Sequence, residues 1–263
     1  MESKRRMMSL DGESRGMFDV EPAGRETAIS VLKHPTATRF LMSLTIYQME
    51  YSPFCIPITA ALQASGTAFE TREIPNWDRT ELLRLTGGAY YQVPVLVHDG
   101  KVITESSGDS EDVANYIDTH FVAGRLFPDR LDGLQKIVIE FLSDDVEFHT
   151  FRLQDPFTLD RINDPVSRGL FLRHKERKFG RGCVEQWRRD AAQIRAEADR
   201  LLERFETTLR YSPFLFGDAP VYSDFLLYGI LGNLTYAQHN PLNAGQTALA
   251  KFAISIREFR FGP

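Results

Sequence analysis

The chain has 263 residues, with 31 Lys and Arg against 36 Asp and Glu, so its formal net charge is −5. This length predicts one large or two modest domains, and 43% hydrophobic with 25% charged residues is typical of a globular protein. The acidic balance argues against a nucleic-acid partner. The sequence has no apolar run of about 18 residues, which argues against a membrane partner. Two cysteines, Cys55 and Cys183, are too few for a disulfide framework and favour the reducing cytoplasm.

Residues 1–42 differ in character from the rest of the chain. Basic and acidic side chains alternate there without helical or strand periodicity, and several glycines interrupt any element. The segment lacks the apolar core of a secretory signal, and it carries acids that a transit peptide would avoid. We therefore expect residues 1–42 to form a partly disordered extension.

The next 80 residues alternate between strand and helix patterns. Strands are predicted at 44–47, 69–74, 93–97 and 102–104, and helices at 58–63, 78–85 and 113–121. Asp78 is placed to cap the second helix, Gly87 and Gly88 to end it, and Asp99-Gly100 to form a hairpin turn. A βαβ unit requires a parallel strand pair, and the hairpin adds an antiparallel strand. This order predicts an α/β thioredoxin-like domain over residues 43–122.

After Pro128 the strand patterns mostly vanish. Helices are predicted over 131–148, 182–209, 223–236 and 248–259, with a loop between Pro156 and Pro165. The run 223–236 is apolar throughout, which is typical of a buried central helix. We therefore expect an all-α helical-bundle domain over residues 129–260, with the domain boundary near 121–128.

Ser52 and Cys55 lie between the first predicted strand and the first helix. A helix N-terminus favours anions, so a thiolate is stabilised there. Ser52 cannot take part in a dithiol cycle, but its hydroxyl can donate a hydrogen bond to a thiolate on a ligand. The simpler alternatives are a plain helix cap for Ser52 and an inert buried thiol for Cys55.

Two further positions carry candidate chemistry. Val93-Pro94 opens a strand, where a cis peptide bond would leave the backbone of Val93 able to pair with an extended peptide. The alternative is a trans proline at a sheet edge. Asp109 and Ser110 lie at a predicted helix start, where they suit a ligand's carboxylate and ammonium groups, or serve as a cap alone.

Together these motifs resemble the glutathione transferase superfamily. The resemblance rests on four segments in order: Tyr51-Ser-Pro-Phe-Cys55, Gln92-Val-Pro-Val-Leu96, the run from Asp109 to Ile117, and the run from Phe214 to Asp224. It covers roughly residues 43–255. It implies a thioredoxin-like domain followed by an all-α domain, with glutathione as co-substrate and a homodimeric assembly.

The resemblance also implies residue roles. Ser52 would stabilise the glutathione thiolate, with the adjacent Tyr51 as an alternative donor. Val93, before a cis Pro94, would pair with the cysteinyl part, and Gln92 would contact the glycyl end.

An acidic residue followed by serine would bind the γ-glutamyl end. Asp109-Ser110 is favoured over Glu105-Ser106, because the family's acidic residue lies seven positions before a helix tyrosine, as Asp109 does before Tyr116. Val221 stands where the family has a serine or threonine helix cap, although Asp224 of that motif is present.

These implications favour an enzyme that joins glutathione to an electrophilic, apolar or aromatic small molecule. The second-substrate pocket should lie between the domains, near the helix that starts at Leu131 and near Tyr228 or Trp187, although such aromatic residues are more typical of a core. The alternatives are a Cys55-dependent thiol-disulfide oxidoreductase and a non-catalytic binding protein that keeps the fold. The histidines show no metal-ligand spacing, so we expect no metal site.

Overall fold

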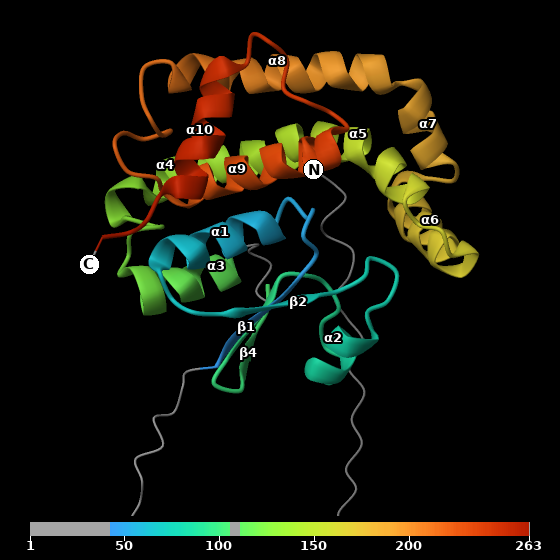
Figure 1. The fold of residues 1–263 in the computed structure, drawn as a ribbon, viewed down its shortest axis with the longest axis horizontal. Helices are drawn as coiled ribbons and strands as arrows, with labels where there is room; N and C mark the ends of the chain where they lie inside the picture. Colours follow the sequence, from blue (N-terminus) through green and yellow to red (C-terminus); the bar gives the residue numbers. More distant parts are fainter. Residues whose placement is uncertain (1–42, 106–110, 263) are drawn as a thin grey trace, which may run out of the picture. The chain divides into compact units, whose positions relative to one another are not determined.

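The structure is a computed structural model that describes residues 43–105 and 111–262 (Figure 1). The predicted extension 1–42 lies outside these ranges. So do two of the predicted site residues, Asp109 and Ser110.

A four-stranded sheet forms the centre of the N-terminal part. Its strands are β1 (Leu44–Gln48), β2 (Glu70–Glu73), β3 (Val95–His98) and β4 (Lys101–Ile103), in the order β2-β1-β3-β4. β2 is parallel to β1, whereas β3 is antiparallel to both β1 and β4. Asp99 and Gly100 have positive φ angles of 48° and 82° and make the turn between β3 and β4. The predicted thioredoxin-like arrangement is therefore confirmed.

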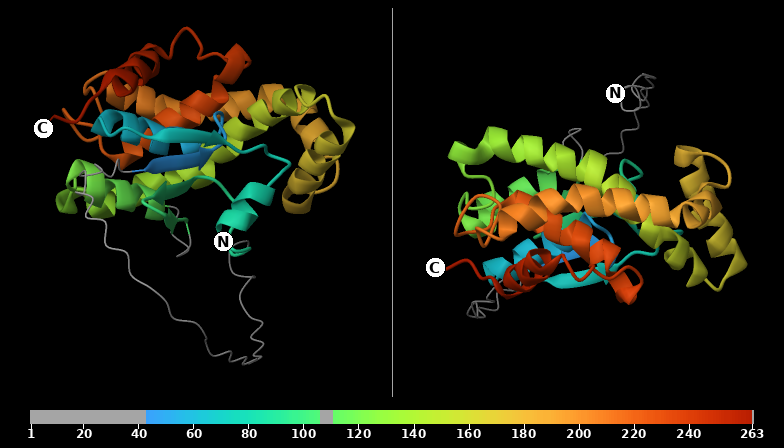
Figure 2. Two further views of the ribbon diagram at one scale, coloured as in Figure 1. Left: turned by 60° about the horizontal axis from the view of Figure 1, so that its bottom comes forward. Right: turned by 90° about the horizontal axis from the view of Figure 1, so that it is seen from above.

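Helices α1 (Cys55–Ser65), α2 (Thr80–Leu85) and α3 (Asp112–Ile117) accompany the sheet. Successive strand residues point to opposite faces. Ile46 and Leu96 belong to the main core together with α1 and α3, while Val95 packs in a small second cluster with Leu82 of α2. Figure 1 shows α1 and α3 between the sheet and the helical part of the chain, and Figure 2 shows the chain from two further sides. Asp78 accepts a hydrogen bond from the Thr80 amide at 2.9 Å at the start of α2, but the N-cap position predicted for it is occupied by Arg79.

The C-terminal part is helical, as predicted. Its α-helices are α4 (Asp132–Phe141), α5 (Glu147–Asp160), α6 (Pro165–Phe179), α7 (Cys183–Arg189), α8 (Ala191–Leu209), α9 (Tyr222–Leu234) and α10 (Thr247–Glu258). A π-helical turn, Leu142–Val146, joins α4 to α5. None of the helices in the described ranges has the length and apolar character needed to cross a bilayer.

The loop predicted between Pro156 and Pro165 is confirmed for residues 161–164, whereas residues 157–160 belong to α5. Pro156 lies inside α5, where both flanking turns are buried, so packing outweighs the cost of about 3 kcal/mol that a proline imposes on a helix. Pro165 is the first residue of α6, and Asp164 caps that helix by accepting a hydrogen bond from the Ser167 amide at 2.7 Å. The sequence analysis missed α6 because it took an Asp-Pro helix start for a loop boundary.

The single helix predicted over 182–209 is also wrong, because it divides at Asp190 into α7 and α8. Trp187 of α7 and Ile194 of α8 are both buried, and both helices pack on α5. The two residues are seven positions apart, which is two helical turns, so the apolar spacing continues across the break. Periodicity alone therefore could not reveal it.

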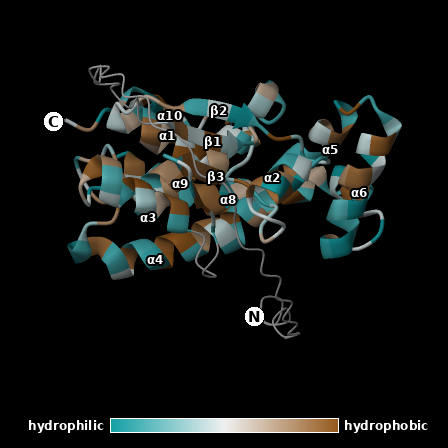
Figure 3. Cartoon of the chain, turned by 90° about the horizontal axis from the view of Figure 1, so that it is seen from below, coloured by the Kyte–Doolittle hydropathy of each residue, from teal (hydrophilic) through white to brown (hydrophobic). Residues whose placement is uncertain are grey.

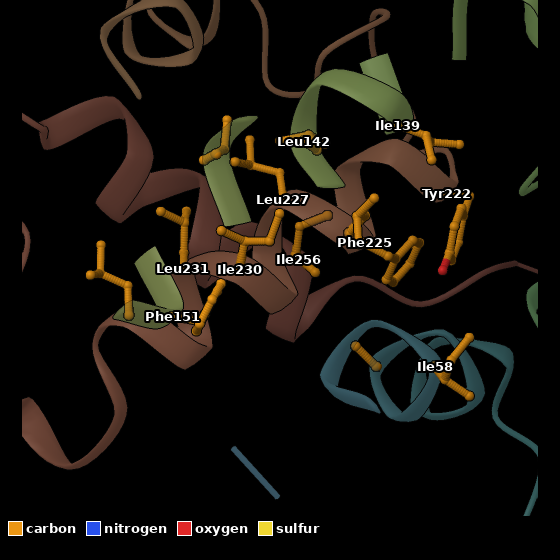
Figure 4. Close-up of a cluster of buried hydrophobic side chains, with 14 of the residues drawn as sticks. Ile58, Ile139, Leu142, Phe151, Tyr222, Phe225, Leu227, Ile230, Leu231 and Ile256 are labelled. Carbon is orange, nitrogen blue, oxygen red and sulfur yellow. The ribbon is translucent and has the colours of Figure 1, made fainter. Parts of the chain in front are cut away.

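Helix α9 is the buried centre of the helical part, as predicted. It packs against α1 on one side and α5 on another. Figure 4 shows part of this core, with Ile58 from α1 and Phe225, Ile230 and Leu231 from α9. At its start, the buried Asp224 carboxylate accepts hydrogen bonds from the amides of Leu215 at 2.8 Å and Val221 at 3.0 Å. Val221 has no side-chain acceptor, so only the aspartate half of the capping motif forms.

Two glycines let α9 approach the chain that precedes and begins α1. A Cβ atom at Gly229 would lie 2.4 Å from the Pro53 carbonyl oxygen and 2.5 Å from Pro57 Cδ. At Gly232 the nearest atom would be the terminal Cδ1 of Ile56, at 3.0 Å. The first approach is to backbone and a rigid ring, and the second is to a flexible side-chain end.

Replacing Gly229 with alanine should therefore destabilise the protein by about 1–3 kcal/mol, because the overlap forces α9 and the turn apart. Gly232→Ala is the matched control: the Ile56 methyl group can move, and alanine gains up to about 1 kcal/mol in helix propensity. Urea unfolding of both variants measures the difference. Equal midpoints for the two variants would contradict the close approach.

Candidate active site

A cavity of about 490 Å³ opens beside the turn that precedes α1. The turn and the segments around α2 and β3 form one wall, and α5, α6 and α9 form the other. Three predicted site residues line it: Ser52, Gln92 and Val93. These residues, up to 41 positions apart in the sequence, are thus brought to one surface.

Ser52 is held by backbone hydrogen bonds on both sides. Its amide donates to the Met49 carbonyl at 2.9 Å, and its own carbonyl accepts from the amides of Cys55 and Ile56, both at 3.1 Å. The side-chain oxygen accepts a hydrogen bond from the Phe54 amide at 3.3 Å, and the hydroxyl hydrogen can donate either to the neighbouring Cys55 sulfur or to a ligand. Ser52 is only 5% exposed, so a donor here acts in a largely water-excluded setting.

Cys55 is the first residue of α1 and is fully buried. It is a free cysteine, and it does not reach the surface of the cavity. Burial raises the pKa of the Cys55 thiol to about 11, against a weaker opposing effect of hydrogen bonding, including one from Ser52. A thiol with that pKa is protonated at neutral pH and is a poor nucleophile. The geometry thus gives no support to the predicted catalytic role of Cys55.

Gln92 and Val93 approach the cavity just before β3. The peptide bond between Val93 and Pro94 is cis, as the sequence analysis anticipated. Gln92 is exposed and Val93 is half-buried, whereas Pro94 is buried beneath them. Both cavity residues are therefore accessible to a ligand.

Of the two predicted γ-glutamyl sites, the structure describes only Glu105. Its carboxylate accepts hydrogen bonds from the backbone amides of Asp112 at 2.7 Å and Val113 at 3.4 Å, and so caps α3. Burial nevertheless raises the pKa of Glu105 to about 8, because those two hydrogen bonds only partly offset the loss of solvation. Asp109 and Ser110 lie outside the described residues, so their role stays a prediction.

Arg79 is a cavity residue that the sequence analysis missed. One of its terminal nitrogens, Nη1, is buried without a hydrogen-bond partner among the described residues. The other, Nη2, lies 3.6 Å from Met49 Sδ, a weak acceptor. Burial lowers the pKa of Arg79, and in the described part of the chain it forms no ion pair. A guanidinium in this state suits a ligand carboxylate. The sequence offered no signal beyond a basic residue beside a helix cap.

Asn233 of α9 is a second missed residue, and it ties the helical part to the turn. Its side-chain amide donates a hydrogen bond of 2.7 Å to the backbone carbonyl of Tyr51. The Tyr51 hydroxyl in turn accepts from the Asn76 side chain at 3.2 Å. Burial raises the pKa of Tyr51 to about 12, so its hydroxyl stays protonated and can also donate into the cavity. A contact across 182 residues has no local sequence signal.

The helical wall differs from the second-substrate pocket expected from the sequence. α5 and α6 line it, with Phe151 and Phe179 as its aromatic residues. Trp187 is 6% exposed and lies in the core, and Tyr228 packs against that core as well. Within residues 43–105 and 111–262, no cluster of histidine, cysteine and acidic residues is arranged to hold a metal ion.

Known proteins are similar to this chain in the sequence of the first domain and in the fold. Residues 46–123 match the family described as glutathione S-transferase, N-terminal domain. A probable glutathione S-transferase of Nicotiana tabacum is 35% identical over 98 residues, which are 36% of this chain and 42% of that protein. The alignment thus spans less than half of that relative.

Solved structures match over a larger part of the chain. A glutathione S-transferase of Ceriporiopsis subvermispora, in complex with glutathione, has a TM-score of 0.69 at 16% identity, covering 84% of this chain and 100% of its own. Glutaredoxin 2 of Salmonella typhimurium, also in complex with glutathione, has a TM-score of 0.63 at 20% identity, covering 81% and 93%. At such identities the likeness establishes the fold. Residues 46–123 thus match the N-terminal domain family of the glutathione S-transferases, and the chain has the fold of these glutathione transferase structures.

Proposed function

We propose that this protein is a glutathione transferase that binds glutathione in the cavity beside Ser52 and joins it to an electrophilic small molecule. The observation that carries the proposal is the convergence of a buried hydroxyl donor, Ser52, with Gln92, Val93 and the unpaired Arg79 on one surface. A tripeptide with a thiol and a terminal carboxylate matches these groups in kind.

In the proposed complex each residue acts on one part of glutathione. The glycyl carboxylate pairs with Arg79, near Gln92, and the backbone of Val93 pairs with the cysteinyl residue. The Ser52 hydroxyl donates to the sulfur and stabilises the thiolate, aided by the dipole of α1. Because the amides of Cys55 and Ile56 already donate to the Ser52 carbonyl, the hydroxyl is the direct donor in this turn.

The reaction is a substitution at an electrophilic carbon. In the substitution, the thiolate forms a sulfur–carbon bond, the leaving group departs with the electron pair of its former bond, and the thiol proton passes to solvent. Lowering the pKa of the glutathione thiol raises the fraction of bound glutathione that is present as the nucleophilic thiolate at neutral pH.

Ser52→Ala removes one charge-assisted hydrogen bond, worth roughly 1.5–3 kcal/mol. Since about 1.36 kcal/mol is tenfold in rate, conjugation should slow by about 10–100-fold, and the pKa of enzyme-bound glutathione should rise. Glutathione affinity should change little, because the other contacts remain. Turnover against pH, together with calorimetric titration, measures both effects.

Cys55→Ala is the control for that experiment, and it should keep most of the activity because the buried thiol does not reach the cavity. An inactive Cys55→Ala beside an active Ser52→Ala would instead support thiol-disulfide exchange. If millimolar glutathione fails to bind at all, the chain is a non-catalytic binding protein of this fold.

Arg79→Met should weaken glutathione binding by about tenfold or more, because it removes the charge that pairs with the glycyl carboxylate. Glutathione esterified at that carboxylate provides the matched ligand. The unmodified protein should bind the ester more weakly than glutathione, whereas Arg79→Met should bind both equally. Arg84→Met, at an exposed arginine of α2, serves as the control variant. A variant that still discriminates between the two ligands would exclude this role for Arg79.

We further propose that the protein works as a homodimer in the reducing cytoplasm. Both cysteines are free and buried, which suits a reducing compartment. Leu134 and Ile137, one turn apart on α4, are 53% and 65% exposed, and Figure 3 shows apolar segments along this helix. A second copy of the chain would cover them in a two-fold interface.

Ile137→Asp should convert the dimer to a monomer, because the interface would then bury an unpaired charge. Sedimentation velocity at micromolar protein measures the change. Ile254→Asp, at an exposed isoleucine of α10, should leave the dimer intact. A monomeric unmodified protein at this concentration would refute the proposed assembly.

A further inference from the structure

The aromatic wall of the cavity is firmly supported from the core. Phe151 of α5 and Phe179 of α6 line the cavity, with ring centroids 5.3 Å apart. The buried Trp187 of α7 meets both rings close to edge-on, at centroid distances of 5.5 and 5.4 Å. Such contacts restrain ring orientation, so this wall is a fixed apolar surface, to which the half-buried Phe179 contributes more than Phe151, which is 8% exposed.

Two lysines of α6 bring ammonium groups to this wall. Lys175 Nζ lies 5.0 Å from the ring centroid of Phe151, and Lys178 Nζ lies 5.1 Å from that of Phe179. Lys175 Nζ is also 2.6 Å from the buried carboxylate of Asp155, which balances its charge. Lys178, which lines the cavity, forms no ion pair with any residue in the described ranges. A positive charge therefore remains at the edge of the aromatic wall.

The other ionisable side chains of the cavity leave that charge largely uncompensated. Burial raises the pKa of Glu147 to about 7, so this carboxyl group is only partly ionised at neutral pH. Desolvation and the neighbouring Lys175 lower the pKa of His174, which is therefore neutral. Arg79 is positive and is matched by the glycyl carboxylate in the proposed complex. Lys178 is therefore the cation of the helical wall with which an anionic group of a ligand can form an ion pair.

We propose that the second substrate is an aromatic electrophile that carries an anionic group, such as a carboxylate, with its ring against Phe151 and Phe179 and the anion bound by Lys178. This inference rests on the proposed function, because glutathione supplies the nucleophile. It makes the substrate class expected from the sequence, an apolar or aromatic electrophile, more specific, since a neutral molecule would form no ion pair with Lys178.

A pair of chlorodinitroarenes tests the proposal: the benzoic acid with chlorine para to its carboxyl group, and the methyl ester of that acid. With either, the thiolate bonds to the ring carbon, chloride leaves with the electron pair of the broken carbon–chlorine bond, and the thiol proton passes to solvent. The quantity compared is kcat/KM divided by the uncatalysed rate constant with glutathione, which corrects for intrinsic reactivity.

The full chain should favour the acid over the ester by about fivefold, through KM, and the preference should shrink at high salt. Lys178→Gln should abolish the preference, and Lys178→Arg should retain it. Arg177→Gln is the matched control, because Arg177 is an exposed cation of the same helix that does not line the cavity. Equal values for acid and ester in the unmodified protein would overturn the proposal, as would a preference that survives in Lys178→Gln.

Binding separates failure of this inference from failure of the proposed function. Calorimetry measures the affinity of acid and ester in the presence of S-methylglutathione, which has no thiol to react. A preference for the acid that depends on Lys178, without turnover of either compound, would support the anionic subsite and refute the transferase activity. Equal affinities, or no binding of either compound, would overturn the inference whatever the turnover.

Discussion

The close packing of α9 against the turn before α1 is the constraint on which the candidate site depends. Gly229 presents backbone to the carbonyl of Pro53, and Asn233 donates a hydrogen bond to the carbonyl of Tyr51. Ser52 lies between these two anchored residues, so the position of its backbone depends on a helix that lies about 180 positions further along the chain. A displacement of about 1 Å at a reacting group can cost 100-fold in rate, which gives this contact a functional weight beyond its packing energy.

The cavity also contains charged side chains whose burial is energetically unfavourable. Arg79 has a buried nitrogen without a hydrogen-bond partner, and burial raises the pKa of Glu147 to about 7. Desolvation of these two groups is unfavourable, and apolar side chains in their place would avoid that cost. Such groups concentrate at functional sites, and for Arg79 a ligand carboxylate would restore the lost interactions when it binds. Lys175 and Asp155 are the contrasting case in the same cavity, because they form an ion pair of 2.6 Å within the protein.

Local patterns predicted the N-terminal part well and the helical part unevenly. The strands, their order along the chain and the turn at Asp99 follow from short-range alternation and turn chemistry, which act within a few residues. Burial on both sides of Pro156 overrode a local helix breaker, and the break at Asp190 left the apolar period intact. In both places packing between helices, rather than local propensity, decided the outcome.

By itself the sequence determined the two-part architecture, the succession of strands and helices in the first part and the positions of Ser52, Gln92 and Val93, because each has a signal in the adjoining residues. Only the tertiary structure decided what surrounds them. It placed Arg79 and Asn233 at the cavity and buried Cys55 away from it. It also made a wall of Phe151, Phe179 and Lys178, which belong to two different helices. The reason is physical: solvent exclusion, an unpaired charge and an aromatic surface are properties of groups brought together from distant parts of the chain, and no local pattern encodes which groups will meet.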